Sequence, residues 1–228
     1  MNKDDIINHL FTLSDEKRKE KMKRFGINIS TALGIPVYEL RAFARKIGKN
    51  HALALELWET NIHEARMLAA LIDIPKEVTE EQMERWALDF NSWDLCDHCC
   101  YNLFDKTPFA YKKINEWSTR KEEFVKRAAF ALIAALSVHD KKADDQTFER
   151  FFLIIEKQCT DERTYVKKAV SWALRGIGKR NKHLNEQAII LAKSIHQLDS
   201  SSAKYIASET LRELQSEKIQ QRIKKKKN

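Results

Sequence analysis

The stretch Tyr165-Val166-Lys167-Lys168-Ala169-Val170 decides the fold, because the chain contains more than one version of it. Phe124-Val125-Lys126-Arg127-Ala128-Ala129 has the same order of aromatic, aliphatic, basic and small residues and begins 41 residues earlier. Ile62-His63-Glu64-Ala65-Arg66-Met67-Leu68-Ala69-Ala70 has a similar pattern, and Tyr205-Ile206-Ala207 is a candidate fourth copy. A period near 40 residues is the size of one helix pair in a stacked repeat protein.

The rest of the sequence favours helices joined by short turns. Only 5 glycines and 3 prolines occur in 228 residues, too few for the many tight turns of an all-β fold. Pro36 suits a first helical position ahead of an apolar stripe that ends at Gly48, and Thr79 with Gln82 predicts a capping box. We therefore expect about a dozen helices in an all-α, HEAT-like repeat solenoid of antiparallel helix pairs, an alpha-alpha superhelix.

The repeat predicts one continuous domain followed by a basic tail. We expect a single HEAT-like domain over residues 1–215 and a disordered tail over residues 216–228. Arg222 and Lys224–Lys227 supply five positive charges of the formal net charge of +8. The tail is either a solvated end or an additional contact for phosphates. Trp58, Trp86 and Trp117 lie on apolar stripes and are expected in the core.

The basic residues of the repeat predict a binding surface for a polyanion. Stacking would align them along one concave face, where regularly spaced cations suit a phosphate backbone. The alternative is that they are solvated helix surfaces. The expected DNA-binding residues are Lys126, Arg127, Lys167, Lys168, Arg175, Lys179 and Arg180.

The placement of the cysteines and the lack of long apolar runs indicate a reduced, cytoplasmic protein that does not enter a membrane. Cys96, Cys99 and Cys100 lie within one short helical stretch, which is a poor arrangement for disulfides, and Cys159 is isolated. Structural zinc usually needs a second pair of ligands, and none follows these cysteines and His98 at a suitable spacing. No apolar leader and no run of 18 apolar residues is present. We expect no metal and no membrane partner.

The most distinctive segment is Asn91-Ser92-Trp93-Asp94-Leu95-Cys96-Asp97. On a helix, Trp93 and Asp97 share one face, where an aromatic plane and a carboxylate suit a cationic ligand or a developing positive charge. The alternative is an ordinary helix start, with Asn91 or Ser92 as the cap and Trp93 in the core. Trp172, which is surrounded by cations, is open to the same two interpretations.

The order of these motifs resembles that of the AlkD-like DNA alkylation repair family. The resemblance covers roughly residues 20–215, and four segments carry it: residues 34–41, 93–97, 124–129 and 166–175. It implies a HEAT-like solenoid that cradles duplex DNA. It also implies an N-glycosylase, acting as a monomer without a cofactor, that excises cationic alkylated bases such as N3-methyladenine and N7-methylguanine.

The resemblance also implies roles for four residues. Asp97 matches the essential carboxylate, and Trp93 and Trp172 match the two aromatic residues that pack around the sugar and backbone of the lesion. Arg127 matches the arginine beside the backbone phosphate. We therefore expect Asp97, Trp93 and Trp172 as catalytic residues, and we expect them to meet Arg127 in one cleft.

Residues 21–30 depart from the family pattern. The glycosylases have an aromatic residue and a longer connection before the first Gly-hydrophobic segment, and we place no counterpart of that aromatic here. Relatives with altered N-termini bind branched DNA without excising bases. Three functions therefore stay open: a DNA N-glycosylase, a non-catalytic binder of branched or damaged DNA, and a protein-interaction solenoid.

Overall fold

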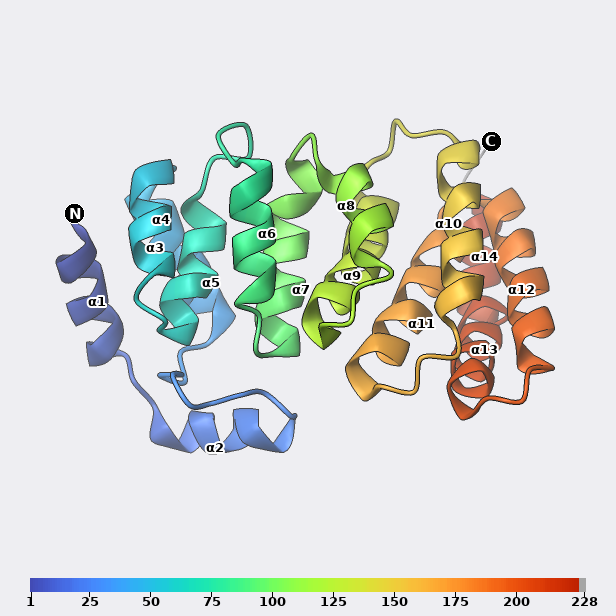
Figure 1. The fold of residues 1–228 in the computed structure, drawn as a ribbon, viewed down its shortest axis with the longest axis horizontal. Helices are drawn as coiled ribbons and strands as arrows, with labels where there is room; N and C mark the ends of the chain where they lie inside the picture. The colour runs from blue at the N-terminus through green and yellow to red at the C-terminus, as the bar shows by residue number, and fades with distance from the viewer. Residues whose placement is uncertain (226–228) are drawn as a thin grey trace. The chain divides into compact units, whose positions relative to one another are not determined.

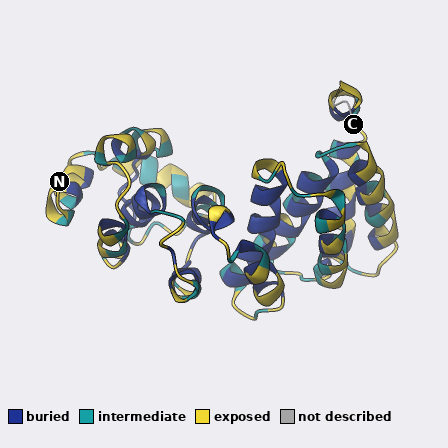
Figure 2. Ribbon diagram, turned by 90° about the horizontal axis from the view of Figure 1, so that it is seen from above, coloured by how far each residue is buried: buried dark blue, intermediate teal, exposed yellow. Residues whose placement is uncertain are grey.

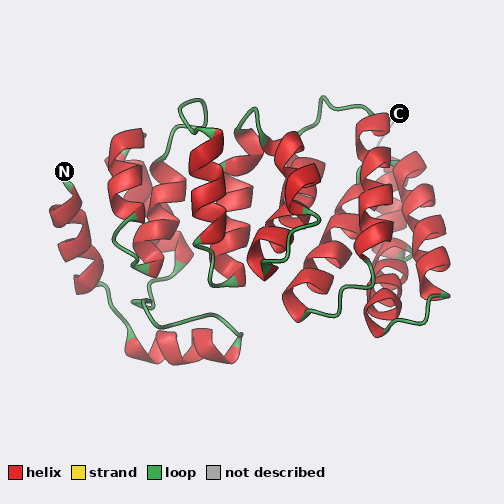
Figure 3. Ribbon diagram, in the orientation of Figure 1, coloured by secondary structure: helices red, strands yellow, loops and turns green. Residues whose placement is uncertain are grey.

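The computed structural model describes residues 1–225, which form fourteen α-helices, one short 3-10 helix and no β-strand (Figures 1 and 3). The expected all-α class is confirmed for this part of the chain. No helix within residues 1–225 is both long and apolar enough to cross a bilayer. The contacts divide the chain into two compact units, Met1–Phe109 and Ala110–Asn228. That residues 1–215 act as one domain stays a prediction.

The first unit is built around α5 (His63–Ile72), in which every residue except Leu71 is buried. The helix packs against α3 (Val37–Ile47), α4 (His51–Trp58) and α7 (Trp93–Asn102), so its polar residues are enclosed together with its apolar ones. The other helices of this unit are α1 (Lys3–Thr12), α2 (Glu16–Arg24), α3 (Val37–Ile47), α4 (His51–Trp58), α6 (Glu80–Leu88), α7 (Trp93–Asn102) and the 3-10 helix η1 (Phe104–Lys106).

Aromatic rings fill the core of the first unit. Trp58 and Trp86 stack with their ring centroids 3.8 Å apart, and Phe90 and Phe104 lie near them. Both indoles are fully buried, as is Trp117 in the second unit. The core position expected of these three tryptophans is confirmed.

The second unit has α9 (Glu123–His139), α11 (Thr164–Gly178) and α13 (Ser201–Leu214) packed in succession. These helices contain the repeated sequence motifs, and their buried sides face one another (Figure 2). A Cβ at Gly176 of α11 would lie 2.6 Å from Oγ of Ser137, so glycine permits the close approach to α9. The remaining helices of the unit are α8 (Ala110–Trp117), α10 (Asp145–Gln158), α12 (Lys182–His196) and α14 (Glu217–Lys225).

Two expected helix starts are refined by the structure. α3 begins at Val37, so Pro36 is the N-cap rather than the first helical residue, and Gly48 follows its end. Thr79 caps α6 by accepting a hydrogen bond from the backbone N–H of Gln82 at 3.1 Å. The reciprocal half of the capping box does not form. The side-chain NH₂ of Gln82 donates to Asp73 at 2.7 Å, and this bond orients the amide away from the N–H of the cap residue.

The segment expected as a basic tail includes α14. Ile219 and Ile223 of this helix are buried, while Arg222 and Lys224 are exposed. An amphipathic helix therefore occupies residues 217–225. Lys226 and Lys227 lie outside the described residues.

Candidate functional site

α7 is half buried, and three of its partly exposed residues form a stripe along one side. Trp93, Asp97 and Tyr101 are partly exposed and follow one another at i, i+4 spacing, so they lie on one side of α7. The buried residues of the helix are Leu95, Cys96, His98, Cys99 and Cys100. Trp93 is thus not sealed in the core, and Tyr101 extends the stripe by one more turn.

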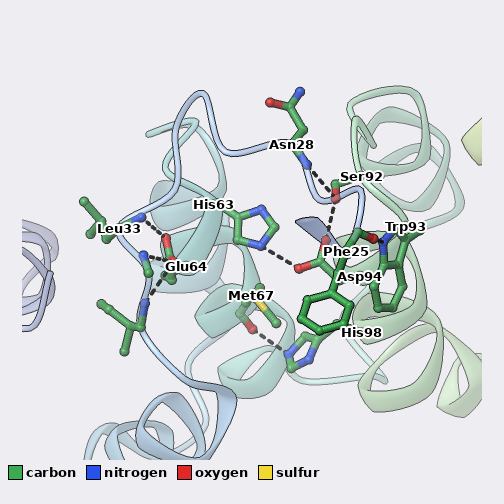
Figure 4. Close-up of polar contacts among 12 residues, drawn as sticks. Phe25, Asn28, Leu33, His63, Glu64, Met67, Ser92, Trp93, Asp94 and His98 are labelled. Carbon is green, nitrogen blue, oxygen red and sulfur yellow. Dashed lines mark hydrogen bonds and ion pairs between the residues drawn. The ribbon is translucent and has the colours of Figure 1, made fainter. Parts of the chain in front are cut away.

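A chain of hydrogen bonds anchors the start of α7 (Figure 4). The carboxylate of Asp94 lies 2.9 Å from Nε2 of His63 and accepts a bond of 2.5 Å from Oγ of Ser92. Ser92 in turn accepts a bond of 3.3 Å from the backbone N–H of Asn28. Asp94 is therefore engaged in the scaffold, and Asp97 is the carboxylate on the accessible stripe.

The pKa values of His63 and Asp94 move in opposite directions. Burial would lower the pKa of His63, but the hydrogen bond and the charge of Asp94 outweigh burial and raise it above 6.5. Burial would raise the pKa of Asp94, but the hydrogen bonds from His63 and Ser92 outweigh burial and lower it below 3.8. The two shifts favour an ion pair between α5 and α7.

Asp94→Asn is expected to destabilise the protein most between about pH 4.5 and 6, by about 1–3 kcal/mol. The raised pKa of His63 gives stability that is present below its ordinary value of 6.5 and is lost as pH rises through the folded pKa. The lowered pKa of Asp94 gives stability that is present above 3.8 and is lost as pH falls through the folded pKa. Urea unfolding at pH 3, 5.5 and 8.5 measures this. A loss that stays constant across these pH values would contradict the ion pair.

The side chain of Trp93 is fixed by the segment that follows α2. Its indole Nε1 donates to the backbone carbonyl of Phe25 at 3.1 Å (Figure 4). Because the indole N–H is a donor only, this bond sets the direction of the ring. Residues 25–28 and the start of α7 are therefore joined twice, through Trp93 and through Ser92.

A second buried carboxylate holds the loop before α3. Glu64 is fully buried and accepts backbone N–H bonds from Leu33 and Gly34, both at 2.7 Å, and from Ile35 at 3.2 Å. Gly34 has φ +83°, and a Cβ there would meet the carbonyl of Asp15 at 2.3 Å. The Gly-Ile-Pro motif is thus a loop wrapped around Glu64, which also contacts the start of α2.

The cysteines and the histidine of α7 belong to the core. Nε2 of His98 donates to the carbonyl of Met67 at 3.0 Å, and burial lowers the pKa of His98 to about 4. Burial also raises the pKa of Cys99 and Cys100 well above the ordinary thiol value. These side chains therefore act as small buried groups, and among residues 1–225 no cluster of three potential metal ligands occurs.

Two of the cations expected on the DNA surface are enclosed in α9. Lys126 is buried and pairs with Asp161 at 2.9 Å. Arg127 is buried too and donates to the carbonyl of Tyr165 at 2.6 Å. Arg66, the residue at the corresponding place in the motif of α5, likewise donates to a carbonyl, that of Trp58 at 3.1 Å. In the copies of α5 and α9 this arginine therefore binds the backbone of a neighbouring segment.

The expected cations of α11 and of the two residues that follow it differ in their contacts. Arg175 and Lys179 both bind Glu213 of α13. Arg180 donates to three carbonyl groups in the last turn of α9 and just after it, those of Ser137, Asp140 and Ala143. It also lies over the ring of Phe148 at 3.8 Å. Lys168 is exposed, and Nζ of Lys167 lies 5.8 Å from the ring of Tyr205. Contact of any of these residues with DNA stays a prediction.

The structure groups the four expected site residues in pairs. Trp93 and Asp97 lie on α7 of the first unit, whereas Arg127 and the partly exposed Trp172 lie on α9 and α11 of the second. The meeting of the two pairs in one cleft stays a prediction. Sequence reasoning missed the His63–Asp94 pair and Glu64, although the adjacent polar residues 63–64 in an apolar repeat were a signal of buried polar roles.

The helical repeats and the stripe on α7 define a class of all-helical repeat proteins with an accessible tryptophan and carboxylate. Residues 6–217 match the model of a family described as DNA alkylation repair enzyme, so the chain belongs to that family.

Individual relatives are distant in sequence. An uncharacterized protein of Listeria innocua serovar 6a is 23% identical over 165 residues, which are 71% of each chain. A solved structure described as "a new family of proteins related to the HEAT-like repeat DNA glycosylases with affinity for branched DNA structures" is 19% identical. It superposes with a TM-score of 0.77 over 93% of this chain and 95% of its own. The HEAT-like fold expected from the repeat is thereby confirmed.

Proposed function

We propose that this protein is a DNA glycosylase that excises cationic alkylated purines, such as N3-methyladenine and N7-methylguanine, from duplex DNA. The observation that carries the proposal is the stripe of Trp93 and Asp97, the accessible side of a helix whose other residues are largely buried. Membership of the DNA alkylation repair enzyme family supports the same substrate class.

The chemistry requires stabilisation of a positive charge on the sugar. When the N-glycosidic bond breaks, its electron pair leaves with the base, which becomes neutral, and an oxocarbenium ion forms at C1′. The carboxylate of Asp97 stabilises this ion and orients a water molecule. The water oxygen bonds to C1′ and loses a proton, leaving an abasic site and a free base. The indole of Trp93 adds cation–π attraction for the charged lesion.

The second candidate is a binder of branched DNA without excision activity. Its support is α2, which has six basic and two acidic residues and no buried residue, and which lies in the segment that departs from the glycosylase pattern. The structurally similar protein described above has affinity for branched DNA. Both candidates require DNA binding, and they differ only in the release of a base.

The test combines binding and excision by the purified protein on methylated, unmodified and branched duplexes. Release of methylated base supports the glycosylase. Tight binding of branched DNA without release on any probe supports the second candidate. Failure to bind all three probes at low salt would reject both functions.

Lys168→Gln is expected to weaken DNA binding by a few fold, whereas Lys126→Gln should mainly reduce stability. Lys168 is exposed, so losing one phosphate contact should reduce the slope of log K against log salt by about 0.9. Lys126 pairs with Asp161 in a largely buried setting, and breaking that bond should cost about 1–3 kcal/mol. Salt titrations and urea unfolding of both variants measure this. An unchanged slope for Lys168→Gln would place that residue off the DNA surface.

A further inference from the structure

α2 is a helix that buries none of its residues. Its nine residues include six cations and two carboxylates, and a helix this short is only marginally stable alone in water. Hydrogen bonds at the first residue before the helix stabilise it. Asp15 accepts the N–H of Arg18 at 3.0 Å and donates its own N–H to the carbonyl of Leu33 at 2.8 Å. The fold therefore maintains a solvent-facing basic helix beside the Glu64 loop.

The six cations of α2 lie on more than one side of the helix, and Lys23 is exposed on a different side from the stripe described next. Arg18 and Lys19 are partly covered, and they pair locally with Asp15 and Glu16 at 3.8 and 3.0 Å. The residues Lys17, Lys21 and Arg24 are exposed, and no described carboxylate pairs with them. Their i, i+4 and i+7 spacing places them on one stripe about 60° wide. A stripe of cations suits a run of backbone phosphates.

An exposed aromatic ring follows this stripe directly. Phe25 is 74% exposed, the largest value among the exposed large hydrophobic residues of the described chain. Its backbone carbonyl accepts the indole N–H of Trp93 at 3.1 Å, and the following Asn28 binds Ser92. The backbone at Phe25 is thus tied to the candidate site, while its side chain stays largely exposed. Because the acceptor is a carbonyl, the tie does not depend on the phenyl group.

We propose that α2 and Phe25 form a DNA-contacting element beside Trp93, in which Lys17, Lys21 and Arg24 bind phosphates and Phe25 stacks on an unpaired base. The inference rests on the DNA binding of the proposed function. Base stacking on an aromatic ring tolerates any sequence and requires a base freed from its own stack. The element therefore favours DNA with a branch, bulge or displaced base over continuous duplex. α2 lacks the broad apolar face of a helix that lies on a membrane, so nucleic acid is the fitting partner.

Phe25→Ala tests the stacking. It should weaken binding to a duplex with a single-nucleotide bulge by about 5- to 150-fold and leave binding to continuous duplex within about twofold. Phe25→Trp, which keeps an aromatic plane, should restore binding to the bulged probe. Tyr38→Ala removes another exposed ring of the same unit and should change neither affinity. Equal affinities of Phe25→Ala and wild type for the bulged probe would overturn the proposal.

The cation stripe is tested with two triple variants of equal charge. Lys17→Gln, Lys21→Gln and Arg24→Gln together should weaken binding to both probes and reduce the salt slope by up to about 2.7, or 0.9 for each phosphate contact. The control triple Lys141→Gln, Lys142→Gln and Lys193→Gln removes exposed charges of the second unit and should have a much smaller effect. Equal losses for both triples would show a net-charge effect and overturn the assignment.

The failures of the two proposals are distinguishable. If the wild-type protein binds and excises from duplex DNA but Phe25→Ala and the α2 triple behave as wild type, the element fails and the proposed function survives. If the wild-type protein binds no DNA probe, the proposed function fails as well. Binding of anionic phosphatidylserine vesicles that is lost in the α2 triple, with DNA binding unchanged, would assign α2 to membranes and also overturn the proposal.

Discussion

Replacing Glu64 by alanine is expected to reduce the free energy of unfolding by about 3–5 kcal/mol. The side chain is fully buried, and its removal leaves the backbone N–H groups of Leu33, Gly34 and Ile35 without their acceptor. Chemical denaturation at neutral pH measures the loss. The variant should also weaken DNA binding, because the Leu33 carbonyl, which accepts from Asp15, positions the start of α2.

Glu64→Gln is the matched comparison for this prediction. One oxygen of Glu64 serves Gly34 and Ile35, and the other serves Leu33. The amide keeps one acceptor oxygen but turns its NH₂ group toward the remaining N–H. The free energy of unfolding of this variant should therefore fall by about 1–3 kcal/mol. Equal stability of Glu64→Ala and wild type would show that the loop does not depend on this carboxylate.

Asp97→Asn is expected to slow base excision by about 10- to 1000-fold. The substitution keeps the shape of the side chain and removes the charge that stabilises the oxocarbenium ion. DNA affinity should change little or rise slightly, because a carboxylate near phosphates repels them. Single-turnover release and equilibrium binding, measured separately, resolve the two effects.

The control for Asp97→Asn is Asp199→Asn, which removes the same charge from a fully exposed carboxylate of the second unit. Its excision rate should match that of the wild type. An Asp97→Asn protein that excises as fast as the wild type would remove Asp97 from the chemistry, and the stripe on α7 would then be a binding feature only.

The helical framework could be predicted from the sequence because it depends on local, periodic signals. Short-range rules account for the motif spacing of 41 residues, the cap at Thr79 and the apolar stripes with Trp58 and Trp86. The bounds of α3 were predicted to within one residue for the same reason. Helix propensity and periodicity are sufficient to predict an element where no distant partner competes for its side chains.

The polar contacts could not be predicted, because each partner is chosen by the tertiary fold. Gln82 should have closed a capping box, but the fold brings Asp73 to it. Lys126 was expected to line the concave DNA-binding face, and the structure pairs it with Asp161 of the next repeat. Periodicity gives the face on which a cation lies but does not reveal whether a carboxylate of the next repeat lies opposite that face.

The candidate site was predictable in part. The i, i+4 spacing of Trp93 and Asp97 follows from the sequence as soon as α7 is a helix. The engagement of Asp94 in the scaffold depends on His63, which lies 31 residues earlier and pairs with it. The tie between Trp93 and Phe25 spans 68 residues, so no local pattern reveals it.

The most direct test is the release of free base from a duplex that contains a single N7-methylguanine, with purified wild-type protein in excess over DNA. We expect free N7-methylguanine to accumulate well above the rate of spontaneous depurination, with an equal amount of abasic strand and a much slower release by Asp97→Asn. Release no faster than in the protein-free control, while a mobility shift shows that all of the duplex is bound, would contradict the glycosylase function.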